Sequence, residues 1–326
     1  MIKQPSRLYY LYICAYHLET KSIVLYIPLM NNLSNISCRL LLLVLLLILT
    51  PYDTLSGDRL RVVTTIPTLK EFVRQVGGER VEVVSLLKGG EDLHTFDPRP
   101  SDTRAVYNAD VLIKIGIGLD DWADKVAAAS GNKKLIVIET SKGVNVISSP
   151  GENPSHTHGN PHIWHDPENA KVMVENIYQA FIKVSPANAD YFKVNKDAYI
   201  ARLTDLDREL DATISDIKDR RVVTYHPGWA YLLRRFQLRE MFSIEKAPGR
   251  EPSAREIARA IETIRKENIR LILGEPEAPK KVLDIISKKS GAVAVNLAPE
   301  IGSLPQATGY IEMMRYNVGE IAKGLK

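Results

Sequence analysis

Short β-branched runs alternate with helical stretches along most of this 326-residue chain, and this alternation limits its fold more than any other feature. One series starts at residues 59–65 and a second at residues 221–225. Between them, residues 167–218 have helical spacing throughout. Strands that alternate with helices form parallel sheets covered on both faces. We therefore predict an α/β fold with two lobes, each a mainly parallel sheet flanked by helices, joined by a long rigid helix.

This pattern divides the chain into four parts. Residues 1–57 form a leader region, 58–185 the N-terminal lobe, 186–218 the connecting helix and 219–326 the C-terminal lobe. Two lobes suit the length of the chain, because single domains usually hold about 100–200 residues.

The leader region contains the apolar run LLLLVLLLIL, from Leu40 to Leu49. Ten residues are too few to span a bilayer, which needs about 20, but they match the core of a signal peptide. Small residues follow and give a cleavage zone before Asp58, and we expect translation to begin at Met30. The run predicts export to the periplasm or another extracytoplasmic site. An uncleaved anchor and an unusually long leader that starts at Met1 remain the alternatives.

Composition excludes several classes of function. The hydrophobic fraction is 45% and the charged fraction 25%, as in globular proteins. The net charge is only +4 and the cations are spread among acids, so we expect no nucleic-acid partner. Both cysteines, Cys14 and Cys38, lie within the leader region. The rest of the chain therefore has no disulfide framework and no thiolate metal site.

Three histidines occupy positions where ligands bind in parallel sheets. His94 lies in the loop after a predicted strand, His226 directly follows another, and His162 lies in the loop between the lobes. Ligands bind at the carboxyl ends of such strands. Three converging imidazoles would form a nitrogen-rich site for a borderline metal such as zinc.

These histidines lie in segments that resemble one known family. The chain resembles, over roughly residues 60–323, the zinc- and manganese-binding solute-binding proteins of bacterial metal ABC transporters. The similar segments, in order, are GGEDLHTFDPRPSD (89–102), NPHIWHDP (160–167), TYHPGWAYLLRRFQL (224–238) and LILGEPEAPKKVLDIISKKSGAVAVNL (271–297).

The resemblance implies that His94, His162 and His226 are metal ligands. Many members of the family supply a fourth ligand from an Asp-Pro pair after the last strand, where this chain has Ala298 and Pro299. Glu275, Glu300 and a water molecule are the candidates for that place, and we favour Glu275.

The resemblance also implies a function: capture of a divalent transition metal and its delivery to a membrane ABC permease. Zn2+ is the expected ligand, because three neutral imidazoles with at most one carboxylate suit zinc. Mn2+ is the alternative ligand, although manganese sites usually contain more carboxylates. We expect a monomer without enzymatic activity. A binding protein for a metal chelate, an adhesin-like surface protein and an exported zinc hydrolase also stay open, although the chain has no HExxH motif.

Other aromatic and histidine side chains receive weaker predictions. His165 is expected to be solvated or to support a metal ligand rather than to bind metal. His156 and His158 lie in a polar loop at about residues 148–166, and their metal role stays open. Trp164 and Trp229 are expected to pack between the lobes.

Overall fold

The computed structural model describes residues 59–148, 159–246 and 249–326. The predicted leader, with its apolar run and its start at Met30, lies outside these residues, as do His156 and His158. Among the described residues, no helix has both the length and the apolar character needed to cross a membrane.

The first sheet contains four parallel strands in the order β2-β1-β3-β4. Its strands are β1 (Leu60–Thr64), β2 (Val81–Ser85), β3 (Val111–Lys114) and β4 (Ile136–Glu139). The helices that connect them are α2 (Pro67–Gly77), α3 (Pro100–Tyr107) and α4 (Trp122–Ser130).

The second sheet repeats this design, with four parallel strands in the order β6-β5-β7-β8. Its strands are β5 (Arg221–Thr224), β6 (Arg239–Ser243), β7 (Leu271–Gly274) and β8 (Val293–Asn296). The helices of this lobe are α7 (Ala230–Arg235), α8 (Ala254–Lys266), α9 (Lys280–Ser290) and α10 (Tyr310–Leu325).

The strand order creates a ligand-binding edge in each lobe. In each sheet the first strand of the lobe, β1 or β5, has its sequential neighbour on one side and a later strand on the other. This reversal is the switch point at which parallel sheets bind ligands, beyond the carboxyl ends of the strands. The inner strands β3 and β7 are buried along their whole length because helices cover both faces.

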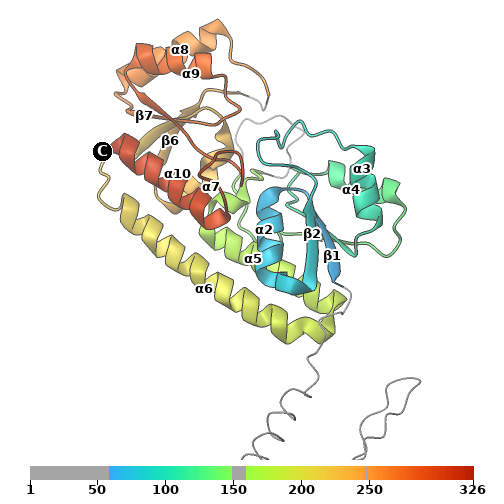
Figure 1. Cartoon of the computed structure of the whole chain (residues 1–326). Helices are drawn as coiled ribbons and strands as arrows, with labels where there is room; N and C mark the ends of the chain where they lie inside the picture. Colours follow the sequence, from blue (N-terminus) through green and yellow to red (C-terminus); the bar gives the residue numbers. More distant parts are fainter. Residues whose placement is uncertain (1–58, 149–158, 247–248) are drawn as a thin grey trace, which may run out of the picture. The chain divides into compact units, whose positions relative to one another are not determined.

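Two long helices join the lobes: α5 (Pro167–Val184) and α6 (Ala189–Ile214). Asp166 is the N-cap of α5, and its side chain accepts a hydrogen bond from the amide of Glu168. The helix ends before Pro186, where a short 3-10 turn starts. Helix α6 has 26 residues, which gives a length of about 39 Å. It packs against α5, α2 and α10 and so contacts both lobes (Figure 1).

One apolar core runs through both lobes and the connecting helices. It contains Leu69 of α2, Phe181 of α5, Leu206 of α6, Leu271 of β7 and Met314 of α10. The predicted two-lobe α/β architecture is thus confirmed, whereas the exact domain boundaries remain a prediction. The shared core couples the lobes mechanically, because separating them would expose apolar surface to water.

Candidate metal centre

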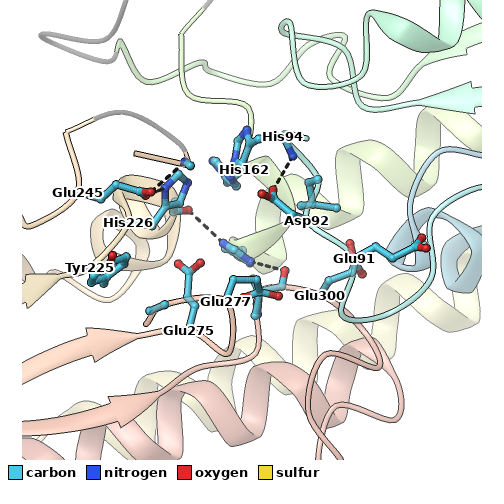
Figure 2. A pocket seen from close by; sticks show the side chains of 16 residues that line it. Glu91, Asp92, His94, His162, Tyr225, His226, Glu245, Glu275, Glu277 and Glu300 are labelled. Carbon is cyan, nitrogen blue, oxygen red and sulfur yellow. Dashed lines mark hydrogen bonds and ion pairs between the residues drawn. The ribbon is translucent and has the colours of Figure 1, made fainter. Parts of the chain in front are cut away.

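Three histidine side chains meet in the cleft between the lobes (Figure 2). Each of His94, His162 and His226 offers one ring nitrogen, and the three nitrogens all lie within 4.8 Å of one another. The ring centroids are 5.1 to 5.2 Å apart in each pair. The structure therefore brings together the three histidines that the sequence singled out.

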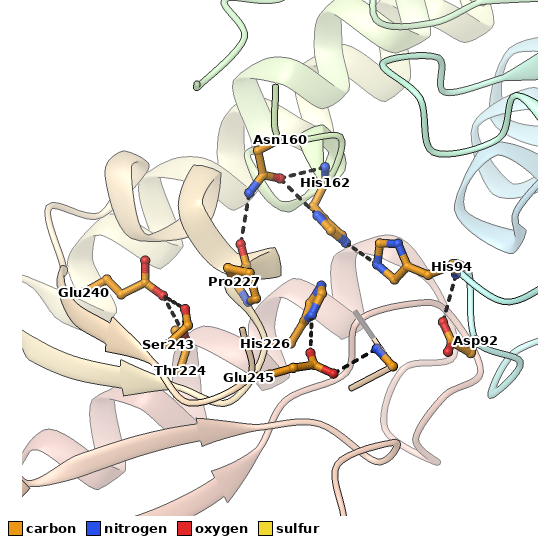
Figure 3. Close-up of polar contacts among 11 residues, drawn as sticks. Asp92, His94, Asn160, His162, Thr224, His226, Pro227, Glu240, Ser243 and Glu245 are labelled. Atoms are coloured by element: carbon orange, nitrogen blue, oxygen red, sulfur yellow. Dashed lines mark hydrogen bonds and ion pairs between the residues drawn. The ribbon is translucent and has the colours of Figure 1, made fainter. Parts of the chain in front are cut away.

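His226 is positioned at the switch point of the second sheet. It lies two residues after the end of β5, and its Nδ1 is 2.7 Å from Oε2 of Glu245, which follows the neighbouring strand β6 (Figure 3). The other oxygen of Glu245 accepts a hydrogen bond of 2.9 Å from the amide of Gly249. A carboxylate at Nδ1 favours the tautomer in which Nε2 has the lone pair that binds a metal.

His162 is positioned by Asn160 in the segment between the lobes (Figure 3). Asn160 Oδ1 lies 3.0 Å from Nδ1 of His162 and also accepts from its backbone amide at 3.0 Å. The amide orientation of Asn160 follows from its Nδ2, which donates to the carbonyl of Pro227 at 2.9 Å. Oδ1 therefore accepts the Nδ1 proton of His162, and Nε2 is again the nitrogen that can bind a metal.

The spacing of two histidine nitrogens suits a shared ion. Nε2 of His162 and Nε2 of His94 are 3.2 Å apart. Two nitrogens that bind one tetrahedral zinc at 2.0–2.1 Å lie about 3.3 Å from each other. The pair therefore already has nearly the separation that zinc requires.

The loop that carries His94 is fixed from both sides of the histidine. The carboxylate of Asp92 accepts from the amide of His94 at 2.8 Å and from the hydroxyl of Thr95 at 3.0 Å. The ring of Phe96 packs against Trp122 of α4, with centroids 4.6 Å apart. These contacts restrain the loop on both sides of the half-buried imidazole.

Gly228 allows the histidines to approach so closely. A Cβ atom at this position would lie 3.0 Å from Cδ2 of His226 and 3.4 Å from Cδ2 of His162. Any other residue would therefore crowd the imidazole of His226 and touch that of His162.

The cluster faces a cavity of about 110 Å³ that is rich in carboxylates. Those that line it are Glu91, Asp92, Glu245, Glu275, Glu277 and Glu300. Glu91 is paired with Arg99 at 2.9 Å, and those of the other carboxylates that are ionised favour a divalent cation in the cavity. Burial raises the pKa of Glu275 to about 7, although the nearby His226 acts in the opposite direction.

The two carboxylates predicted as candidates for the fourth ligand make different contacts. Glu275 directly follows β7 and lines the cavity, but it is not part of the group of three ring nitrogens. Glu300 also lines the cavity, but its Oε1 accepts from the hydroxyl of Thr68 and, at 2.7 Å, from the amide of Ile301. The identity of the fourth ligand remains a prediction.

His165 is buried and not solvated. Its ring lies parallel to Trp229 at 4.4 Å, and its nitrogens lie 3.2 Å from the carbonyl oxygen of Gly228 and 3.0 Å from that of Pro299. Burial lowers its pKa to about 4, so the ring is neutral and donates from one nitrogen. Trp164 is buried beside it and donates to the same Pro299 carbonyl at 3.0 Å.

Sequence reasoning missed three residues that shape the site: Glu245, Asn160 and Gly228. For Glu245 a signal was present, because it comes directly after the predicted strand 238–244, just as His226 follows its own strand. The roles of Asn160 and Gly228 depend on contacts between segments that are distant in sequence.

Known proteins match this chain over most of its described length. The zinc-binding protein AdcA of Streptococcus pyogenes serotype M1 is 27% identical over 288 residues, which covers 82% of this chain and 56% of AdcA. The chain thus spans about half the length of such relatives. The high-affinity zinc uptake system protein ZnuA of Bacillus subtilis is 27% identical over 284 residues, which covers 83% of this chain and 89% of that protein.

A solved structure shows the same architecture. The solute-binding protein FpvC of Pseudomonas aeruginosa, in complex with Mn2+, has a TM-score of 0.74 and 28% identity, covering 82% of this chain and 98% of FpvC. The family model described as "ZnuA: Zinc-uptake complex component A periplasmic" matches residues 62–324. With the second sheet, the connecting helices and all three clustered histidines inside that match, the chain belongs to the ZnuA family.

Proposed function

We propose that this protein is an extracytoplasmic solute-binding protein that captures Zn2+ in the cleft between its lobes and delivers it to an ABC permease for import. The observation that carries the proposal is the convergence of His94, His162 and His226. Hydrogen-bond acceptors at Nδ1 of His162 and His226 prepare the opposite nitrogen of each ring to bind metal.

Zinc is favoured over manganese by the type of ligand. Three imidazole nitrogens are typical of zinc sites, whereas manganese prefers sites with more oxygen ligands. The two curated relatives are named for zinc, while FpvC was solved with Mn2+, so manganese remains the alternative cargo. We propose Glu275 as the fourth ligand, with Glu300 or water as the alternatives.

The family supports the remaining parts of the proposal. A periplasmic component of an uptake complex works outside the cytoplasm and transfers its metal to a membrane permease. We propose that residues 1–57 direct this export and that the protein acts as a monomer. Transport rather than catalysis is the role of this family, which argues against an exported zinc hydrolase.

Zinc titration of histidine variants tests the site. The purified chain should bind one Zn2+ in competition with a chromogenic chelator. Single alanine changes at His94, His162 or His226 should each weaken zinc binding far more than the double change His156→Ala and His158→Ala. If the double variant loses as much affinity as the cleft variants, the site has been placed wrongly.

Elemental analysis and activity assays test the competing functions. Protein purified from its exported compartment should contain zinc in excess of manganese. A panel of ester and peptide substrates should show no hydrolysis by the zinc-loaded protein. Turnover that disappears in His162→Ala would instead support a hydrolase.

A further inference from the structure

Helices α8 and α9 form a strongly basic surface on the C-terminal lobe. Together they carry eight Lys or Arg and three Asp or Glu, a net charge of +5, while the whole chain has a net charge of only +4. The two helices pack against each other and cover the face of the second sheet that lies away from α10 and α6 (Figure 1). The positive charge of the chain is therefore concentrated on one side of one lobe.

The equivalent surface of the N-terminal lobe is neutral. There α3 and α4 cover one face of the first sheet, in a core cluster that contains Val106 of α3 and Val126 of α4. Each of these two helices carries one acidic and one basic residue. Covering a sheet therefore does not require a basic surface, and the charge on α8 and α9 needs another explanation.

Five cations point outward from α8 and α9. The buried residues of these helices, such as Ile264 and Ile286, face the sheet. Residues on the opposite stripe of each helix are exposed. Five of them are basic: Arg255, Arg259, Lys266, Lys281 and Lys288. We call these five cations the basic face. None of their side chains has a hydrogen bond or an ion pair with another residue that the structure describes.

The acids of these helices do little to neutralise the basic face. Glu256 pairs with Arg250 at 2.7 Å, and Asp284 pairs with Lys280 at 2.8 Å. Only Glu262 is both exposed and outside any ion pair with the described residues. The cations of the basic face are thus available to an external partner.

An extended basic surface suits an extended anionic partner. Arg255 and Lys266 lie at opposite ends of α8, about 17 Å apart along its axis. Ile285, with an exposed fraction of 37%, adds an apolar side chain between Lys281 and Lys288. Anionic lipid headgroups attract such cations, and the membrane interface accepts apolar side chains. A periplasmic component of an uptake complex works next to a membrane, which makes a lipid surface the anionic partner nearest to it.

We propose that the basic face binds the anionic headgroups of the membrane surface and keeps the protein beside its permease. A protein held at the membrane is more concentrated near the permease than one free in solution. None of the five cations lines the metal cavity, so this contact leaves the residues of the cavity uncovered. The inference rests on the proposed export of the protein and not on the identity of its metal.

Binding to lipid vesicles tests the proposal. Protein purified from its exported compartment should bind vesicles of phosphatidylglycerol and phosphatidylcholine in equal parts more tightly than vesicles of phosphatidylcholine alone. The ratio of the two affinities is the readout, because binding through a retained leader would raise both. The preference should disappear at about 1 M salt, where charges are screened beyond about 3 Å.

A triple variant measures the contribution of the basic face. Arg259→Gln, Lys281→Gln and Lys288→Gln together should lower the affinity ratio about a hundredfold at low salt. Each cation near an anionic surface contributes about fivefold in affinity, so the effects of three multiply to this size. The three side chains are exposed and unpaired among the described residues, so the variant should fold as the parent does.

A matched control removes the same charge from the N-terminal lobe. Arg104, Lys125 and Lys133 are also exposed, and their side chains have no ion pair with another described residue. Arg104→Gln, Lys125→Gln and Lys133→Gln together should leave the affinity ratio close to that of the parent. Because both variants lose three positive charges, a difference between them cannot come from net charge.

Two results would overturn the proposal. Equal losses in the two triple variants would mean that vesicle binding follows net charge rather than the basic face. A parent protein without preference for anionic vesicles would exclude a lipid partner, and binding of poly-glutamate through the same cations would then indicate an acidic protein partner. His162→Ala should bind vesicles as the parent does, so a protein that binds vesicles but no zinc would refute only the proposed metal function.

Discussion

The carboxylate of Glu245 lies 2.7 Å from Nδ1 of His226, and both side chains are buried. These two residues follow neighbouring strands, β6 and β5, so the contact is fixed by the edge of the second sheet. A carboxylate in this position orients the imidazole and makes its other nitrogen a better metal ligand.

Replacing Glu245 should therefore weaken zinc binding without removing a ligand. Loss of such supporting partners typically costs 10–100-fold in metal affinity. We expect Glu245→Gln to fall in this range by chelator competition, and His226→Ala to lose more. Equal affinity in Glu245→Gln and the parent protein would show that the contact does not tune the site.

Gly228→Ala should weaken zinc binding by crowding. The added methyl would lie 3.0 Å from His226 and 3.4 Å from His162, so the ring of His226 must shift. Gly319→Ala is the matched control, because a Cβ there meets nothing within 4 Å. Gly319 lies inside α10, where alanine should raise the free energy of unfolding by about 0.5–1 kcal/mol and leave zinc affinity unchanged. Similar zinc affinities in both variants would contradict the crowding argument.

Proton release can identify the fourth ligand. Burial raises the pKa of Glu275 to about 7 in the metal-free protein, so the group is mostly protonated at pH 6. Its contribution to stability is complete below its unfolded pKa, near 4.3, and is lost as the pH rises through 7. A carboxylate must lose its proton to bind metal.

We expect zinc binding at pH 6 to release more protons from the parent protein than from Glu275→Gln. Calorimetry in buffers of different ionisation enthalpy measures this number. The pKa of Glu300 is also raised to about 7 by burial, so Glu300→Gln is a direct comparison. If Glu300→Gln, and not Glu275→Gln, lowers the proton release, Glu300 is the fourth ligand.

His165 should make the protein sensitive to acid. Burial lowers its pKa to about 4, whereas histidine in an unfolded chain has a pKa near 6.5. The stability that it contributes is therefore complete above pH 6.5 and is lost as the pH falls towards 4.

His165→Phe keeps a ring to stack on Trp229 and removes the titration. The loss of unfolding free energy between pH 7 and pH 4.5 should be smaller in this variant by about 2–3 kcal/mol. Denaturant titrations of both metal-free proteins at the two pH values provide the comparison. Parallel pH profiles would mean that His165 is protonated in the folded protein.

The strands and the three histidines could be predicted because their signals are local. A β-branched run such as residues 269–274 identifies a buried strand, and a polar residue directly after it lies at the carboxyl edge of the sheet. This reasoning placed His94 and His226 beyond the strand ends, where the structure also has them, and their role as ligands remains a prediction. It gave no indication of what lies opposite each side chain, because facing residues come from other segments.

Glu300 illustrates that limit. Its sequence position, shortly after the last strand, makes it a candidate metal ligand, and that assignment remains a prediction. Its contact with Thr68 requires the two lobes to be placed against each other, which no local pattern encodes. Asn160 is similar, since its hydrogen bond to the carbonyl of Pro227 joins two segments 67 residues apart.

The apolar core that runs through both lobes also determines how the protein folds. Residues 58–326 form one compact unit, and each sheet contributes strand residues to the core that it shares with the connecting helices. Heat or denaturant should therefore melt this unit in a single cooperative transition, although it has two sheets. A fragment ending at residue 185 or starting at residue 219 would expose its part of that core, so we expect either fragment to aggregate when it is expressed alone.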